Sequence, residues 1–114
     1  MITLWHNPRC SKSRQALALL EEAGAKVAIR RYLEDAPSLA ELQAVHRALG
    51  SPPAGEMMRP KEPEFTAAGL STTDSDAILL QAMADHPKLI ERPIAIRGAQ
   101  AKLGRPPEQV LLLL

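Results

Sequence analysis

The sequence is poor in the residues that most often reveal a protein's class. It contains one cysteine, so it cannot form an internal disulfide, and its fold does not depend on an oxidising compartment. Tryptophan, tyrosine and phenylalanine occur once each, so aliphatic side chains must build the core. No apolar run approaches the length of a membrane span, and no leader of basic and then apolar residues opens the chain. We therefore expect a soluble, cytoplasmic protein without a membrane partner.

Net charge is also nearly absent. The chain has 14 basic and 13 acidic residues, which leaves a formal charge of +1. The basic residues are scattered rather than gathered in a stripe, which argues against a nucleic-acid partner. A length of 114 residues suits one domain with a modest core. We expect a single domain that spans residues 1–114, without repeats or linkers.

The single cysteine, Cys10, lies where one pattern of residues changes into another. Residues 2–5 are mostly apolar and predict a β-strand that runs to His6, whereas apolar residues recur at helical spacing from about Ser11 to Ala23. Gly24 follows, in the position where many helices end on a left-handed residue. Cys10 is therefore predicted to lie on a strand-to-helix turn.

Such a turn favours a negative charge on the sulfur. The first N–H groups of the helix, on residues 11–13, have no intrahelical partner and carry a partial positive charge. Four side chains near Cys10 in the chain add basic groups: His6, Arg9, Lys12 and Arg14. The same amides and guanidinium groups can hold a tetrahedral oxyanion, so we assign Ser13 and Arg14 to substrate binding.

Most lone cysteines are small buried hydrophobic residues rather than nucleophiles. The run from Pro8 to Arg14 is too polar for a core segment, however, and it surrounds the sulfur with basic groups. We therefore predict that Cys10 is a nucleophile beside an oxyanion site.

The middle of the chain alternates between strand and helix signals. Residues 26–32 have the pattern of a second strand, which a crossover helix would place parallel to the first. Ser38 and Glu41 have capping-box spacing ahead of a helix that Gly50 ends. Four prolines then leave residues 51–70 mostly irregular, with short helical pieces.

The last third of the chain predicts a helix, a hairpin and a helix. The Thr-Thr-Asp run at residues 72–74 can cap a helix that Pro87 ends. Two short segments around Arg97–Gly98 have the pattern of a hairpin, and residues 104–108 begin the final helix. The predicted order is therefore βαβ, then helices, then ββα.

This order, with a cysteine opening the first helix and an X-Pro bond before the third strand, is the plan of the thioredoxin-like fold. We expect an α/β protein with a mixed four-stranded sheet and a helical insertion. Four separated motifs closely resemble the short form of the glutaredoxin-dependent, ArsC-like family of bacterial arsenate reductases: residues 6–14, Arg59, Arg92-Pro93-Ile94 and Gly104-Arg105-Pro106-Pro107-Glu108.

The resemblance implies roles for individual residues. Cys10 corresponds to the thiolate that attacks arsenate, and His6 to the histidine that helps to keep this sulfur ionised. Pro93 corresponds to the proline whose preceding peptide bond is cis. The arginines that bind the anion correspond to three residues of this chain: Arg59, Arg92 and Arg105.

The resemblance also implies partners. Glutathione attacks the thiol-linked arsenate ester, arsenite leaves, and glutaredoxin clears the mixed disulfide. We expect no bound cofactor, with glutathione as a co-substrate. We expect no metal either, because His46 and His86 lack the spacing of a metal-binding set.

Two alternative functions remain open. The chain has no Cys-X-X-Cys motif, so any turnover needs an external thiol. A related monothiol oxidoreductase could use a different oxyanion or a glutathione-linked substrate. A non-catalytic Spx-like regulator that binds RNA polymerase is the other alternative, although such a regulator senses oxidants through a cysteine pair that this chain lacks.

Overall fold

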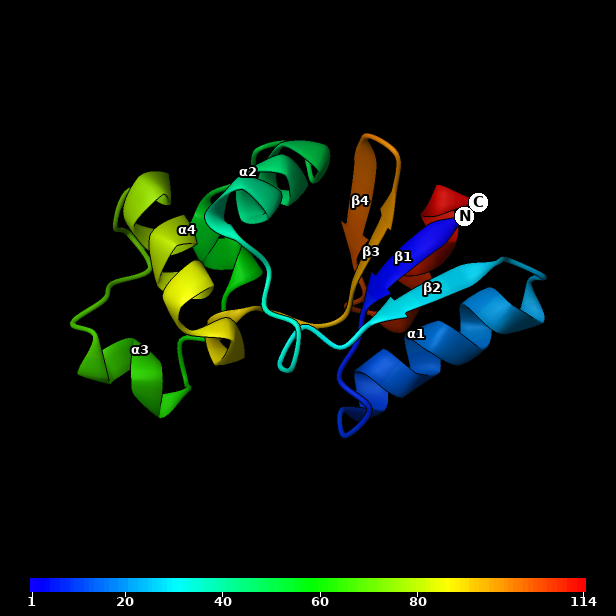
Figure 1. Ribbon diagram of the computed structural model, residues 1–114, viewed down its shortest axis with the longest axis horizontal. Coiled ribbons are helices and arrows are strands. Elements are labelled where there is room, and N and C mark those ends of the chain that lie inside the picture. Colours follow the sequence, from blue (N-terminus) through cyan, green and yellow to red (C-terminus); the bar gives the residue numbers. More distant parts are fainter. The chain divides into compact units, whose positions relative to one another are not determined.

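Strand β1 (Ile2–Trp5) lies in the middle of a four-stranded sheet in the computed structural model, which describes residues 1–114 (Figure 1). It pairs in parallel with β2 (Val27–Arg30) and antiparallel with β3 (Ile94–Arg97), which forms a hairpin with β4 (Gln100–Leu103). The strand order is β2-β1-β3-β4. The predicted mixed sheet and the predicted hairpin are both confirmed.

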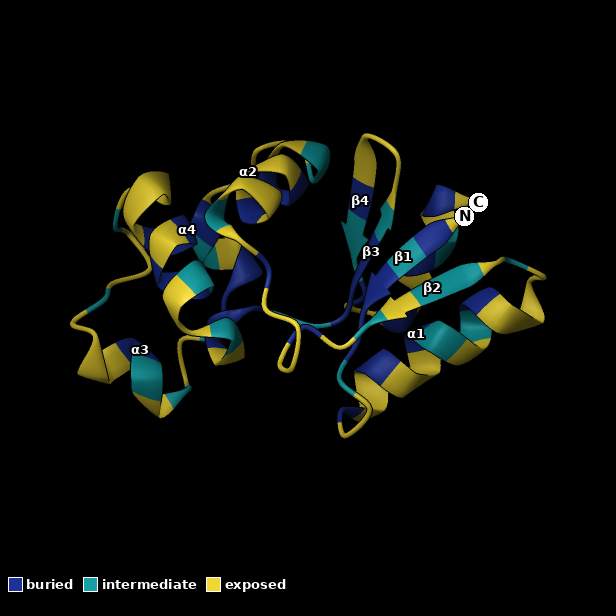
Figure 2. Ribbon diagram, in the orientation of Figure 1, coloured by how far each residue is buried: buried dark blue, intermediate teal, exposed yellow.

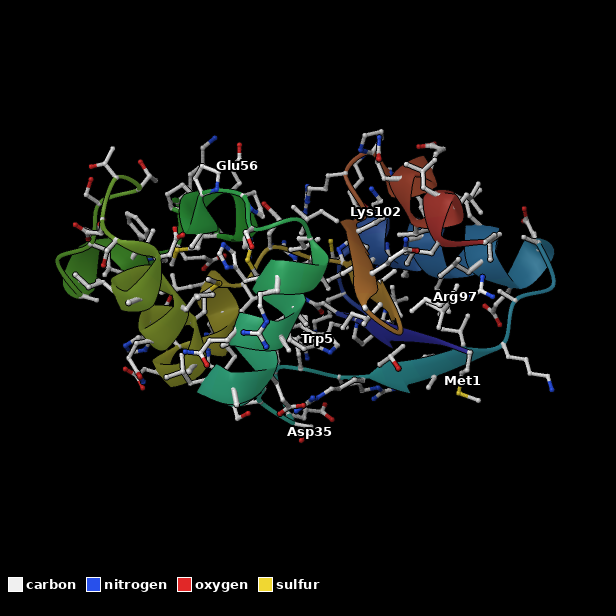
Figure 3. The ribbon with its side chains drawn as sticks, turned by 90° about the horizontal axis from the view of Figure 1, so that it is seen from above. Met1, Trp5, Asp35, Glu56, Arg97 and Lys102 are labelled. Carbon is white, nitrogen blue, oxygen red and sulfur yellow. The ribbon has the colours of Figure 1, made fainter.

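Helix α1 (Ser11–Glu22) and the 3-10 helix η3 (Pro107–Leu113) pack on one face of this sheet. The register pairs Leu4 with Ala95, and both face these helices. Figure 3 shows η3 alongside α1. The buried cluster on this face is aliphatic throughout and consists of Ile2, Leu4, Ala16, Leu20, Ala95, Val110 and Leu113. Burial of these side chains is the main source of stability in this part of the chain.

The opposite face of the sheet also carries apolar side chains. Trp5 pairs with Ile94 across β1 and β3, and both are buried. The Arg30 guanidinium lies 5.7 Å from the centre of the Trp5 ring, at the distance of a cation–π contact. Figure 2 shows that β1 is mostly buried along its length, whereas β2 at the edge is more exposed.

The chain divides into two compact units. The sheet, α1 and η3 form the first unit, made of residues 1–35 and 92–114, and residues 36–91 form the second. The second unit is therefore the predicted helical insertion between β2 and β3. The expectation of a single domain stays a prediction.

The helices and strands named in the structure include only helices in the second unit. Its α-helices are α2 (Leu39–Ala48), α3 (Pro63–Ala67) and α4 (Asp76–Asp85), and its 3-10 helices are η1 (Ala54–Met57) and η2 (Pro87–Leu89). Ser38 and Glu41 form the predicted capping box at the start of α2. The proline-rich stretch holds only short helices, as predicted. No helix in the protein has the length and apolar character needed to cross a membrane.

The predicted cap of α4 is wrong. The N-cap residue is Ser75, whose hydroxyl accepts a hydrogen bond from the Ile78 N–H at 3.3 Å. The side chain of Asp74 instead accepts from the Ser71 N–H, and Thr73 hydrogen-bonds to Ser71. These side chains close a turn before the helix, so they do not cap it.

Smaller boundary differences occur around α1. This helix ends at Glu22 rather than Ala23, and Gly24 has the left-handed φ of +79° expected after a helix. Strand β1 ends at Trp5, so His6 lies just beyond the sheet. This shift places His6 in the turn that leads to Cys10.

We predict that Leu20→Ala lowers the unfolding free energy by about 2–5 kcal/mol, because it leaves a cavity at a fully buried position of α1. Urea unfolding followed by fluorescence of Trp5, the only tryptophan, measures this change in the first unit. The matched control is Leu112→Ala, at a position 64% exposed, with an expected change within about 0.5 kcal/mol. Equal losses in the two variants would contradict this account of the core.

Candidate functional site

Cys10 is the N-cap residue of α1. Its backbone is extended, with φ −93° and ψ 124°, and its carbonyl accepts the first helical hydrogen bond from the Arg14 N–H at 3.0 Å. Its own N–H donates to the Asn7 carbonyl, also at 3.0 Å. The residue is 8% exposed. The predicted placement of the thiol on a strand-to-helix turn, at the positive end of a helix, is confirmed.

The buried side chain of Ser13 stabilises the turn that presents Cys10. The Ser13 hydroxyl accepts from the Asn7 N–H at 3.1 Å and lies 2.6 Å from Nδ1 of His6, and the residue is fully buried. A buried hydroxyl with two hydrogen-bond partners is held rigidly. Loss of either bond would leave a buried polar group that water cannot reach and that has no other partner. Ser13 thus has a structural role, and its assignment to substrate binding stays a prediction.

Side chains on the outside of the turn add two further contacts. Asn7 Oδ1 accepts from the Arg9 N–H at 3.0 Å, which closes a local Asx turn. Nη1 of Arg14 donates to the Pro8 carbonyl at 2.9 Å. Arg14 therefore braces the turn, and its contact with an oxyanion stays a prediction.

His6 is buried, and its surroundings favour the neutral form of the ring. Burial lowers the pKa of His6 below 6.5, and the nearby Arg31 and Arg14 guanidinium groups lower it further. The Ser13 oxygen already accepts the Asn7 N–H, so its hydroxyl proton is free to be donated to Nδ1 of the neutral ring. His6 therefore helps to hold the turn in place, and its catalytic role stays a prediction.

Arg105 reaches Cys10 from the other end of the chain. Its Nη2 lies 3.9 Å from the Cys10 sulfur, and its Nε donates to the Arg92 carbonyl at 2.9 Å. The contact joins residues 95 positions apart, and it confirms that Arg105 lies at the thiol. A guanidinium at this distance stabilises a negative sulfur and can share an anion bound there.

Arg92 and Arg105 stand in equivalent places in the sequence, each just before a proline. The Arg92–Pro93 bond is cis, as the resemblance implied, and the Arg105–Pro106 bond is also cis, which nothing in the sequence predicted. Nε and Nη1 of Arg92 are shielded from solvent. The Arg92 backbone lies at the site through its bond to Arg105. That its side chain binds the substrate stays a prediction.

Arg59 belongs to the second unit. Its N–H donates to the Leu89 carbonyl at 2.8 Å, next to the bridge between Met58 and Ile90. Its guanidinium forms an ion pair with Glu62, a partner that sequence reasoning missed although the i, i+3 spacing could have revealed it. The assignment of Arg59 to the anion stays a prediction.

The arrangement around Cys10 can support nucleophilic chemistry on an anion. One sulfur, one helix N-terminus and one guanidinium converge, and the structure has no cluster of three or more His, Cys, Asp or Glu side chains that could hold a metal ion. The thiolate can attack an electrophilic centre while the amides and Arg105 balance the charge on its oxygens.

The chain is similar to several known proteins in sequence and in fold. The sequence profile of the ArsC family matches residues 5–113. The chain is 46% identical to an arsenate reductase of Haemophilus influenzae, over 99% of this chain and 98% of that protein. It is 47% identical to an arsenate reductase of Neisseria meningitidis serogroup A, over 96% and 94% of the two chains. A solved structure of an arsenate reductase from Vibrio cholerae superposes with a TM-score of 0.93 at 48% identity, and covers 99% of this chain and 97% of its own.

The lowered pKa of His6 predicts a pH-dependent stability. Unfolding exposes the ring and restores its pKa to 6.5, so the unfolded chain takes up this proton at higher pH than the folded chain. The unfolding free energy should therefore fall as the pH drops from about 7.5 to 5.5, and this contribution is flat at higher pH. An NMR titration of His6 measures the pKa directly, and urea unfolding at each pH measures the slope.

His6→Asn removes the titrating ring and should flatten this part of the stability profile. His86→Asn, at an exposed histidine in the second unit, is the matched control and should retain the slope. A slope that survives unchanged in His6→Asn would show that other groups cause it.

Proposed function

The chain belongs to the ArsC family, and on that premise we propose that it reduces arsenate to arsenite through a covalent intermediate on Cys10. The observation that carries this proposal is the Arg105 guanidinium, 3.9 Å from a sulfur at the start of a helix. Arsenate is a tetrahedral oxyanion, so its charge suits helix amides and a planar guanidinium. The names of the relatives supply the substrate, and the geometry supports the chemistry.

In the first step the Cys10 thiolate attacks arsenic. A sulfur–arsenic bond forms, an arsenic–oxygen bond breaks, and the departing oxygen leaves as water after taking up protons. Arg105 and the first amides of α1 hold the remaining oxygens and balance the charge that gathers on them. The Ser13 hydrogen bonds keep the sulfur at the helix start, so little rearrangement is needed.

In the second step a glutathione thiolate attacks the Cys10 sulfur. A disulfide forms and the sulfur–arsenic bond breaks with its electron pair on arsenic. Arsenic is thereby reduced from the +5 to the +3 state and leaves as arsenite, while the two sulfurs are oxidised. An external thiol is required because Cys10 is the only cysteine in the chain.

The third step restores the enzyme. A glutaredoxin thiolate attacks the glutathione sulfur of the mixed disulfide, and Cys10 leaves as a thiolate. Glutathione is thus a co-substrate and no resident cofactor is needed. We propose that the protein works in the reducing cytoplasm, because glutathione is abundant there and a free thiol persists.

A coupled assay tests this function. We expect arsenate-dependent oxidation of NADPH when the protein is supplied with glutathione, glutathione reductase and glutaredoxin. Cys10→Ser should abolish the rate, because a hydroxyl at this position is a far weaker nucleophile than a thiolate. Omission of glutaredoxin should slow turnover and omission of arsenate should stop it. An inactive native protein would refute the substrate, and an active serine variant would refute the mechanism.

Arg105→Ala tests the guanidinium separately. A charged hydrogen bond to the sulfur and its bound anion is lost, so we expect kcat/KM for arsenate to fall about 10–100-fold. Alkylation of Cys10 by iodoacetamide at neutral pH should slow as well, because the thiolate loses a stabilising partner. Arg47→Ala removes an exposed arginine from the second unit and should leave both rates unchanged. Equal behaviour of the two variants would remove Arg105 from the site.

A further inference from the structure

Gly104 lies directly before Arg105 and opposite Pro93. Its N–H donates to the Pro93 carbonyl at 2.8 Å. This hydrogen bond extends the pairing of β3 with β4 by one residue beyond the pair of Ile94 and Leu103. Both Gly104 and Pro93 are buried. The hairpin therefore brings these two backbones together at the end that carries the site arginines.

Gly104 has no room for a side chain. A Cβ at this position would lie 2.4 Å from Cγ of Pro93, 2.9 Å from its Cδ and 3.4 Å from Cγ1 of Val110. Its φ is outside the left-handed region that favours glycine, so an L-residue could adopt this backbone. The need for glycine therefore comes from close approach to the Pro93 ring.

The surroundings cannot absorb this clash easily. The proline ring is joined to the backbone at both ends, and Pro93 and Val110 are fully buried in a packed region. To restore ordinary contact at 3.4 Å, the two strand ends must separate by about 1 Å. Gly98, in the turn of the same hairpin, differs because a Cβ there meets nothing within 4 Å.

Separation of the two strand ends by about 1 Å would also displace the next pair of residues, Arg92 and Arg105. Arg105 follows Gly104 and Arg92 precedes Pro93, and Nε of Arg105 donates to the Arg92 carbonyl at 2.9 Å. The same guanidinium is 3.9 Å from the Cys10 sulfur, near the upper limit for a hydrogen bond to sulfur. A shift of about 1 Å would break this contact.

We propose that Gly104 is a positioning residue, which seats the Arg105 guanidinium against the Cys10 sulfur because only a residue without a side chain fits beside Pro93. Gly104 does not touch the substrate and acts through Arg105. Its effect on arsenate kinetics rests on the proposed function, but its effect on the reactivity of the thiol does not.

Four variants test this proposal: Gly104→Ala, Gly98→Ala, Arg105→Ala and the double variant Gly104→Ala/Arg105→Ala. The rate of Cys10 alkylation by iodoacetamide at neutral pH is the main measurement, and Tm is recorded alongside. We expect Gly104→Ala to slow alkylation about tenfold, as far as loss of Arg105 itself does. Gly98→Ala is strained by its φ of +58° and should lower Tm while leaving the alkylation rate unchanged.

The double variant shows whether Gly104 acts through Arg105. When position 105 is already alanine, no guanidinium remains to be displaced, so the same glycine substitution should slow alkylation less than threefold. The Tm of each variant shows that it is folded before the rates are compared. A Gly104→Ala protein that does not fold would refute a positioning role, because Gly104 would then be required for the fold itself.

Three further results would overturn the proposal. One is an alkylation rate in folded Gly104→Ala within twofold of the native rate. Another is an equal slowing by Gly104→Ala with arginine or alanine at position 105. The third is slowing by Gly98→Ala in proportion to its loss of Tm. If the native protein does not reduce arsenate, the alkylation rates still decide the role of Gly104, so the two proposals fail separately.

Discussion

The hydrogen bonds of the Ser13 hydroxyl are the constraint on which the site depends. They join the first turn of α1 to the two residues that follow β1. The Ser13 oxygen lies 2.6 Å from Nδ1 of His6 and 3.1 Å from the backbone nitrogen of Asn7. The sulfur of Cys10 is thereby fixed at the end of a helix whose amides favour an anion. Because Ser13 is fully buried, water cannot replace these partners, and the turn has few alternative arrangements. The same burial lowers the pKa of His6.

The sheet supplies the second half of the site. Antiparallel pairing of β3 with β4 brings Arg92 and Arg105 to one end of a hairpin, and pairing of β3 with β1 brings that end to the turn before Cys10. The close approach of Gly104 to Pro93 then sets how far Arg105 can reach. Thiol and guanidinium therefore meet through backbone pairing, and a change in strand spacing is transmitted directly to the chemistry.

Much of the fold follows from local patterns. Alternating and helical spacings predicted the strands around Leu4 and Ile29, helix α1 and the hairpin at Gly98, and the capping box at Ser38 was confirmed. The cap of α4 was predicted wrongly because several polar residues in succession can each serve as a cap or close a turn. The choice between them depends on hydrogen bonds that the composition of the segment does not specify.

The amino-acid pattern alone placed Cys10 at the start of a helix, because the signals for that turn lie within a few residues of each other. It also showed that the chain has no second cysteine, which is why the proposed cycle uses an external thiol. Three features became visible only in the tertiary structure: the contact of Arg105 with the sulfur, the hydrogen bonds of Ser13 and the lowered pKa of His6. These features depend on strand register, burial and the field of distant charges, which involve residues far apart in the chain. Local spacing carries no information about such distances, and packing decides them.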